Sequence, residues 1–304
     1  MISVIIPFYN ESQLVEPMVK EVQKALNSIG DSYEIIAVDD GSTDHTFELL
    51  ANLKHNLPEL KIVSFSRNFG LQAALTAGLD YANGEYVSLI DGDFQDPPEL
   101  IVEMYHTLKQ NQFDLVIGKR TSRNEVTSKR MAIRAFHLIF DRITDLEDIY
   151  NTGNFCMMKR EVVLAILDIK ESSRYFPGLR SFVGFKRTYL HYDRPDRTKG
   201  EAKMTFGKLL NLATDAIFSF SRWPIKICLW LGFMAIFLLL LAGIYTIVSK
   251  AANWAPLGWS STILSIYFIG TIQLTFLGVI GEYLYRIYKE VQKRPLYIVR
   301  SYIS

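Results

Sequence analysis

Short apolar runs alternate with amphipathic stretches along the first 118 residues of the chain. The runs typical of buried β-strands are ISVIIPFY, YEIIAVDD, KIVSFS, GEYVSLID and FDLVIG. Stretches with helical spacing lie between them, at residues 11–29, 43–53, 68–82 and 98–110. Farther along, NTGNFCMMKREVVLAI predicts a turn, a short strand and a helix. This alternation predicts an α/β domain over residues 1–205, with a mainly parallel sheet and helices on both faces.

Two long apolar segments follow in the last third of the chain. Residues 225–248 carry one charge, at Lys226, and residues 261–281 carry none. Each segment exceeds the roughly 20 residues that cross a hydrocarbon core. The sequence therefore predicts a hairpin of two transmembrane helices within residues 225–304, spanning about 225–248 and 261–284. A pair of buried helices in a large soluble core is the alternative, although a soluble helix normally keeps a polar face.

Basic residues flank the two apolar segments. Arg222 and Lys226 lie at the first segment, and a basic tail follows the second, with Arg286, Lys289, Lys293, Arg294 and Arg300. The positive-inside rule then predicts a multi-pass membrane protein whose termini and N-terminal domain are cytoplasmic. Residues 206–224 have apolar positions at helical spacing, which predicts an amphipathic helix in the interface. A helix that faces the core of the soluble domain explains the same spacing equally well.

Charge and composition exclude several classes of function. The 304 residues include 33 Lys and Arg against 32 Asp and Glu, so no overall field attracts nucleic acid. The two cysteines, Cys156 and Cys228, are far apart, which argues against a disulfide framework. The N-terminal run has no basic region or cleavage site and is predicted to be a strand, not a signal peptide. No G-x-G-x-x-G motif follows it, so the dinucleotide fingerprint is absent.

Polar residues follow four of the predicted strands, at residues 9–11, 39–40, 66–68 and 91–93. Ligands of open α/β sheets bind beyond the carboxyl ends of the strands, so we expect these clusters on one rim. Acidic residues at three strand ends, with an arginine among them, indicate a cation and a phosphorylated ligand. An acidic turn without a ligand is the alternative. Asp96, which precedes two prolines, is predicted to cap the next helix.

The motifs VIIPFYNE, VDDGSTDHT, SRNFG, IDGDFQDPPE and GKR, in this order, resemble those of the GT-A family 2 glycosyltransferases. The ending GVIGEYLYRIYKEVQKRPLYIV is similar to that of the branch that makes polyisoprenyl-phosphate sugars. That branch includes dolichyl-phosphate mannose synthases and GtrB-like bactoprenol glucosyl transferases. The resemblance implies a Rossmann-like GT-A domain, a UDP-sugar donor, Mg²⁺ or Mn²⁺ as cofactor, and a polyprenyl (undecaprenyl) phosphate acceptor.

The reaction implied by this resemblance is an inverting sugar transfer at the cytoplasmic face of a bacterial membrane. Glucose is the first expectation for the sugar and GlcNAc the second. The polyprenyl-phosphate sugar would then serve the decoration of a cell-envelope glycan. A flippase, a downstream transferase and further copies of the chain are the partners that this role implies.

The resemblance also assigns roles to individual residues. Asp91 and Asp93 correspond to the D-x-D pair, with Asp93 the more direct metal ligand. The nucleotide-sugar site is then expected at Pro7, Tyr9, Glu11, Asp39, Arg67, Asp91, Gln95 and Lys203. The lipid phosphate is expected at Arg120, Ser128, Arg130, Arg134 and Arg197. The catalytic candidates are Asp91, Asp93, Asn151 and Asn154.

Two segments depart from the family's pattern. Ala202 replaces a usual Ser in the loop before Lys203, and NTGNF has Asn151 and Asn154 where relatives often have Asp. An Asn cannot act as a general base. A phosphate monoester has a second pKa of about 6, so the acceptor is already mostly anionic and positioning can supply much of the catalysis. The two Asn side chains could instead hydrogen-bond a sugar hydroxyl.

Two other functions agree with parts of the sequence. A processive polysaccharide synthase has a Q-x-x-R-W motif and more spans, whereas SFSRW has Ser219 in place of the Gln. A catalytically weak or silent membrane subunit, partnering a flippase or another transferase, agrees with the Asn pair but not with the intact D-x-D. The sequence does not specify the sugar, the lipid length, the choice between Mg²⁺ and Mn²⁺, or the oligomeric state.

Overall fold

The computed structural model describes residues 1–110, 112–121, 152–172, 174–193 and 259–304, with scattered positions between 228 and 248. The chain divides into two compact units. The first, here called the sheet domain, holds the described residues up to 193 and the C-terminal tail Arg294–Ser304. The second holds the long helix α10, Trp259–Gln292. Each unit is described by itself.

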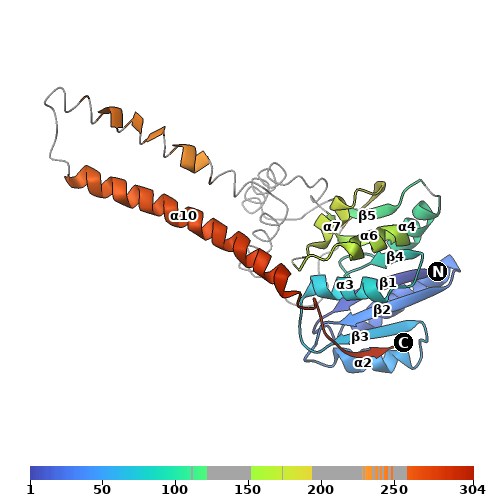
Figure 1. The fold of residues 1–304 in the computed structure, drawn as a ribbon. Coiled ribbons are helices and arrows are strands. Elements are labelled where there is room, and N and C mark those ends of the chain that lie inside the picture. The colour runs from blue at the N-terminus through green and yellow to red at the C-terminus, as the bar shows by residue number, and fades with distance from the viewer. Residues whose placement is uncertain are drawn as a thin grey trace. The chain divides into compact units, whose positions relative to one another are not determined.

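The sheet domain is built on one eight-stranded sheet, in the order β7-β5-β6-β4-β1-β2-β3-β8 (Figure 1). Its strands are β1 (Ile2–Phe8), β2 (Tyr33–Asp39), β3 (Leu60–Phe65), β4 (Tyr86–Leu89), β5 (Leu115–Arg120), β6 (Thr152–Lys159), β7 (Arg187–Tyr192) and β8 (Val299–Ile303). The run β4-β1-β2-β3 is parallel, as is the pair β5 and β7. Strand β6 runs antiparallel between β4 and β5, and β8 pairs antiparallel with β3.

Helices cover both faces of this sheet. One layer contains α1 (Val15–Ile29), α2 (Thr46–Lys54) and α4 (Leu100–Lys109). The other contains α3 (Leu71–Tyr81), α6 (Arg160–Asp168) and α7 (Phe176–Phe182). Alternate residues of β1 divide between the two cores, because successive strand side chains point to opposite faces. The predicted α/β fold is confirmed, and its first four helices match the ranges that the spacing predicts, except that α2 ends one residue later, at Lys54.

A strand that the sequence does not predict comes from the C-terminal tail. Strand β8 pairs with β3, the edge of the parallel run. Just before it, the Tyr297 ring stacks on Phe65 with centroids 5.1 Å apart, and its hydroxyl donates to Asp80 at 2.6 Å. The Tyr302 ring packs against Tyr81 at 4.7 Å. The tail therefore extends the sheet domain beyond the predicted boundary at residue 205.

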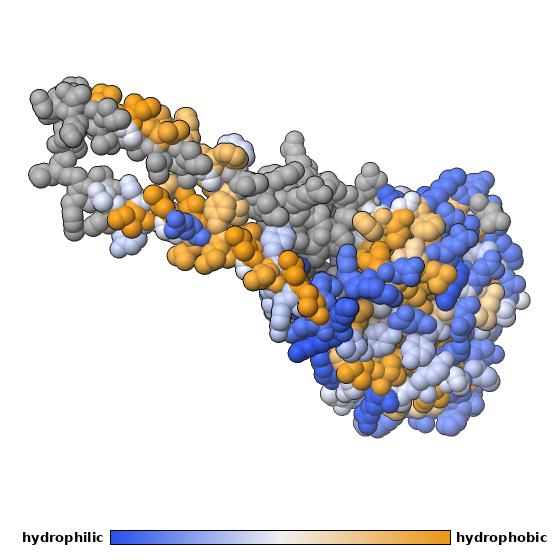
Figure 2. Space-filling view, in the orientation of Figure 1, coloured by the Kyte–Doolittle hydropathy of each residue, from blue (hydrophilic) through white to orange (hydrophobic). Residues whose placement is uncertain are grey.

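Helix α10 is the one segment among the described residues that is long and apolar enough to cross a membrane. Its 34 residues measure about 51 Å at 1.5 Å per residue, more than the ~30 Å of a hydrocarbon core. The window Ser265–Gln292 has a mean hydropathy of 1.3, and Figure 2 shows hydrophobic side chains along most of the helix.

The rest of the predicted membrane hairpin is described only in part. The scattered positions between 228 and 248 are helical, and the others of that first predicted span lie outside the described residues. The predicted interfacial helix at 206–224 lies wholly outside them. The structure therefore supports one candidate span, and the two-span arrangement stays a prediction.

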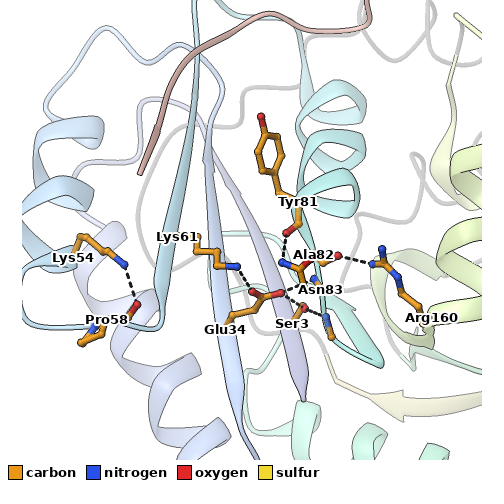
Figure 3. A network of polar contacts seen from close by, with 10 residues as sticks. Ser3, Glu34, Lys54, Pro58, Lys61, Tyr81, Ala82, Asn83 and Arg160 are labelled. Carbon is orange, nitrogen blue, oxygen red and sulfur yellow. Dashed lines mark hydrogen bonds and ion pairs between the residues drawn. The ribbon is translucent and has the colours of Figure 1, made fainter. Parts of the chain in front are cut away.

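A buried polar network joins the strands near their amino ends, away from the rim where ligands are expected (Figure 3). The Glu34 carboxylate accepts hydrogen bonds from Ser3 Oγ at 2.6 Å and Asn83 N at 2.7 Å, and Lys61 Nζ lies 2.5 Å from it. Burial by itself would raise the pKa of Glu34, but these donors, led by Lys61, hold that pKa below its ordinary value. The network fixes β1, β2 and β3 against the turn before β4.

Candidate functional site

The loops after β1, β2 and β3 are joined to one another by hydrogen bonds. Asn10 N donates to Ser42 Oγ at 3.0 Å, and Thr43 N donates to Asn10 Oδ1 at 2.8 Å. Asn68 Nδ2 donates to Asp40 Oδ2 at 2.9 Å. Since β1 to β4 are parallel, their carboxyl ends meet at the same edge of the sheet. The predicted polar clusters therefore share one rim.

The two acidic residues at the end of β2 have different surroundings. The Asp39 carboxylate accepts from Ser42 N at 3.0 Å and from Ser64 Oγ at 2.8 Å. The Asp40 carboxylate accepts from the backbone of Phe69 and Gly70 at 2.7 and 2.9 Å, directly before α3. Burial raises the pKa of Asp40. Asp40 therefore anchors the start of α3, and Asp39 is the residue expected at the nucleotide.

Gly41 allows the loop after β2 to lie close to the loop after β3. Its φ is +64°, and a Cβ at this position would lie 2.3 Å from the backbone carbonyl carbon of Arg67. The guanidinium of Arg67 lies 4.0 Å from the centroid of the Phe69 ring and donates to Asn68 O at 3.0 Å. The structure thus places Arg67 on the rim beside the loop that carries Asp39.

The D-x-D loop turns sharply after β4. Phe94 has a φ of +60°, uncommon for a residue with a side chain, and Gln95 N donates to Asp93 Oδ1 at 3.1 Å. A Cβ on Gly92 would lie 2.8 Å from the Phe8 ring, so this glycine lets the loop close on β1. A backbone held in a sparsely populated region is typical of functional sites. The loop presents Asp91, Asp93 and Gln95 at the same rim.

Burial raises the pKa of Asp91 to about 7. The charges of Asp96 and Asp93 act in the same direction, and the Asn154 amide and Arg120 oppose them. Asn154 Nδ2 lies 3.4 Å from Asp91 Oδ1. An ionised Asp91 is thus disfavoured by its own surroundings, and an added cation would restore it.

The predicted helix-capping role of Asp96 is wrong. Helix α4 begins only at Leu100, and its N-cap residue is Glu99. A capping side chain accepts from the second or third N–H of the helix, and Pro98 has none to offer at the second position. The Asp96 side chain is instead 0% exposed, accepts a hydrogen bond from the Tyr192 hydroxyl, and lies 3.8 Å from Arg120 Nη2.

Arg120 and Tyr192 end two neighbouring strands and are direct partners in the β5–β7 register. Arg120 Nε donates to the Tyr192 hydroxyl at 3.4 Å. The Arg120 side chain is only 13% exposed. No sequence motif marks Tyr192, because its neighbours in β7 do not form an apolar run; only the pairing with β5 brings it to the site.

The start of β6 lies between two guanidinium groups. A Cβ on Gly153 would lie 2.6 Å from Arg120 Nη2, and Gly153 O accepts from Arg180 Nη1 at 3.1 Å. Arg180, on α7, is buried and was not predicted to belong to a site. The NTGNF segment thus brings Asn154 to Asp91 and its glycine to Arg120. The predicted site residues Asn151, Ser128, Arg130, Arg134, Arg197 and Lys203 lie outside the described residues.

The described residues contain no group of three His, Cys, Asp or Glu side chains that could enclose a metal ion. Mg²⁺ does not require such an enclosure, since it is usually held by one or two carboxylates with substrate phosphates and water. Asp91 and Asp93 provide carboxylate oxygens, and because burial raises the pKa of Asp91, a bound cation would favour its ionised form. These residues therefore fit a hard divalent cation shared with a phosphorylated ligand.

Comparisons with known proteins show the family of the chain. The model of glycosyl transferase family 2 matches residues 3–167. An uncharacterized glycosyltransferase of Synechocystis sp. is 40% identical over 300 residues, which cover 98% of this chain and 94% of that one. The SfII prophage-derived bactoprenol glucosyl transferase of Shigella flexneri is 35% identical over 302 residues, covering 99% and 97%.

A solved structure, the mannosyltransferase PcManGT of Pyrobaculum calidifontis in complex with GDP-Man and Mn²⁺, aligns with a TM-score of 0.45. It is 15% identical and covers 91% of this chain and 86% of that one. Similarity at that level carries no weight for the ligands of this chain. The family assignment rests on the matched family model and the full-length relatives, and they establish that this chain is an enzyme that belongs to glycosyl transferase family 2.

Proposed function

We propose that the protein transfers a sugar from a UDP-sugar to a polyprenyl phosphate, with glucose the first candidate sugar and GlcNAc the second. The observation that carries the proposal is the rim itself, where Asp91, Asp93 and Arg120 converge. The relative named as a bactoprenol glucosyl transferase, similar over 99% of the chain, supports the choice of sugar and lipid.

The donor side of the proposed reaction is the edge formed by the loops after β1, β2, β3 and β4. Asp39 is proposed at the base, Arg67 at the nucleotide, and Asp91 and Asp93 at Mg²⁺ or Mn²⁺. When bound there, the cation would neutralise the negative charge that develops on the departing nucleoside diphosphate. Gln95, whose backbone N–H holds Asp93 Oδ1, is proposed to orient the same carboxylate.

The acceptor side is Arg120, with the lipid phosphate as nucleophile. A phosphate oxygen attacks the anomeric carbon, the bond from that carbon to the UDP oxygen breaks, and the configuration inverts. The acceptor needs no strong general base because it is already mostly anionic at neutral pH. Asn154 cannot act as a base, because its side chain is an amide. Since this amide donates to the Asp91 carboxylate, we assign Asn154 to holding Asp91 in place.

Helix α10 supports action at a membrane. The proposal adds the span at residues 225–248 and the interfacial helix at 206–224, with the sheet domain and both termini cytoplasmic. A lipid-linked sugar made there would need a flippase to reach a glycan on the outer side. Association of copies through the membrane helices belongs to the same proposal.

The test is sugar transfer by the full chain in membranes, with labelled UDP-glucose, UDP-GlcNAc, UDP-galactose and GDP-mannose. Each reaction contains undecaprenyl phosphate and Mg²⁺ or Mn²⁺, and the label that enters the lipid phase is counted. We expect transfer from a UDP-sugar, highest with glucose. Asp93→Ala should abolish it, and Asp168→Ala, at an exposed position at the end of α6, should not.

Full activity of Asp93→Ala would overturn the D-x-D assignment. Absence of transfer from every donor, together with no binding of UDP and Mn²⁺ in a titration, would indicate the silent membrane subunit instead.

A further inference from the structure

Behind the D-x-D loop lies a chain of three side chains that the proposed reaction does not yet explain. Arg120 Nε donates to the hydroxyl of Tyr192, and that hydroxyl donates to Asp96. Arg120 Nη2 also lies 3.8 Å from Asp96 Oδ1. Asp96 and Tyr192, here called the Asp96–Tyr192 pair, thus contact the guanidinium at two of its nitrogens.

Burying Asp96 completely is unfavourable unless its charge is matched, because a carboxylate loses several kcal/mol of hydration in the interior. Its partners include the Arg120 guanidinium and the Tyr192 phenol. Burial, followed by the charge of Asp96, raises the pKa of Tyr192 above its ordinary value, so the phenol stays protonated at any working pH. The direction of donation, from Arg120 to Tyr192 to Asp96, is therefore fixed.

The surrounding backbone holds the same three residues in place. Arg120 and Tyr192 are register partners at the last positions of β5 and β7. The Tyr192 ring packs edge-on against Phe155 with centroids 5.8 Å apart. Gly153 leaves room for Arg120 Nη2, since a Cβ there would lie 2.6 Å from it. A long, mobile Arg side chain is thus confined to one orientation beside Asp91.

We propose that Asp96 and Tyr192 are positioning residues that hold the Arg120 guanidinium in the orientation that receives the acceptor phosphate. This inference rests on the proposed function. A guanidinium is a planar fork of five N–H donors, and it grips a phosphate through two of them only when its plane faces the anion. The contacts at Nε and Nη2 set that plane and leave donors for the ligand.

The experiment compares Tyr192→Phe and Asp96→Asn with the unaltered full chain, using UDP-glucose, undecaprenyl phosphate and Mg²⁺. Tyr192→Phe removes one oxygen and keeps the ring against Phe155. We expect the KM for undecaprenyl phosphate to rise at least about tenfold, the factor that corresponds to about 1.4 kcal/mol. The KM for UDP-glucose should stay within about twofold, because the donor residues are untouched.

The chain offers a matched control. Tyr105 also donates its hydroxyl to an aspartate, Asp31, but on helix α4 and away from the rim. Tyr105→Phe removes the same kind of bond and Asp31→Asn the same kind of charge, and we expect both KM values to remain unchanged. Thermal unfolding of all four variants shows whether any has lost its fold, and Tyr192→Phe remains informative if Asp96→Asn is unfolded.

Three results would overturn the inference. The first is an unchanged KM for undecaprenyl phosphate in Tyr192→Phe. The second is a fall in kcat together with a rise in both KM values and a lower Tm, which would indicate a structural role only. The third is a shift in the Mg²⁺ requirement without a shift in the lipid KM. If the unaltered chain transfers no sugar to undecaprenyl phosphate, the proposed function itself fails and the inference fails with it.

Discussion

At the scale of single residues, the three aspartates of the IDGDFQDPPE segment differ in their surroundings. Asp91 and Asp93 could be singled out from the sequence because they lie two positions apart after an apolar run. The role of Asp96 could not, because its hydrogen-bond partner Tyr192 is 96 positions away and lies in no motif. Local pattern predicts a cap before two prolines, and a long-range buried partner overrides it.

Asn154→Asp tests how much charge the D-x-D loop tolerates. The change places a further carboxylate about where an amide now lies, 3.4 Å from Asp91. Because like charges at this distance disfavour each other's ionised form, we expect kcat/KM at limiting Mg²⁺ to fall at least about tenfold. Excess Mg²⁺ should restore part of it.

Asn154→Ser is the control for that change, since it removes the amide without adding charge. Its loss in kcat/KM should be smaller and should not respond to Mg²⁺. A gain of activity in Asn154→Asp would contradict the expectation, and would show that a carboxylate base is what this site lacks.

Gly41→Ala tests the approach of the Asp39 loop to Arg67. Gly30 is a matched control, since its φ of +79° is also left-handed but nothing lies within 4 Å of a Cβ there. We expect Gly30→Ala to lower the free energy of unfolding by about 1–2 kcal/mol, the backbone penalty alone. Gly41→Ala adds a clash at 2.3 Å and should also weaken UDP binding, measured by titration calorimetry. Equal effects of the two changes on UDP binding would refute this reading of Gly41.

At the scale of elements, the first five strands and four helices follow from periodicity, because each strand is an apolar run and each helix has an apolar face. Strand β7 could not be predicted, since its residues are mostly half-buried and alternate charged, polar and aromatic types. The antiparallel insertion of β6 between β4 and β5 is also invisible to local pattern. It decides which residues meet, because it brings Asn154 to Asp91.

Glu34→Gln tests the network at the amino ends of the strands. The change keeps an acceptor for Ser3 and Asn83 but removes the charge that Lys61 faces at 2.5 Å. We expect a loss of about 1.5–3 kcal/mol in the free energy of unfolding at pH 7, the range for hydrogen bonds to charged groups.

The pH dependence of that loss follows from the lowered pKa of Glu34. A carboxyl group whose pKa is lower in the folded state stabilises the fold above its unfolded pKa, near 4.5, and this stabilisation disappears as the pH falls through the folded value. The difference in Tm between the two proteins should therefore be full at neutral pH and shrink below about pH 4. A difference that is constant down to pH 3 would show that the charge of Glu34 is not what matters.

At the scale of the whole molecule, the test concerns α10. Leu274 and Leu277 are 71% and 65% exposed on that helix, whereas Leu164 is 49% exposed on the sheet domain. A charged residue in the bilayer centre costs about 2.5–3.5 kcal/mol on insertion scales. We expect the double change Leu274→Arg and Leu277→Arg to release the protein from membranes on alkaline carbonate extraction. Leu164→Arg should leave it in the membrane fraction, and an unaltered chain that is itself extracted would refute the membrane role of α10.

The sequence predicts that residues 1–205, 206–224 and 225–304 follow one another as separate parts, but the described chain returns after α10 to the sheet, where β8 pairs with β3. Hydropathy alone cannot reveal this return. A short strand after a long apolar helix has the same composition as a surface tail, and its partner β3 lies far back in the chain.

The pairing of β8 with β3 also fixes an order of events during synthesis. The two strands are about 230 residues apart, so at about 5–20 residues per second a ribosome needs roughly 10–50 s to make β8 after β3 has emerged. For that time the edge of β3 carries unpaired N–H and C=O groups, which are a template for aggregation. The edge closes only after the whole of α10 has been translated. A chain that lacks β8 is therefore left with the β3 edge of its sheet open to other strands.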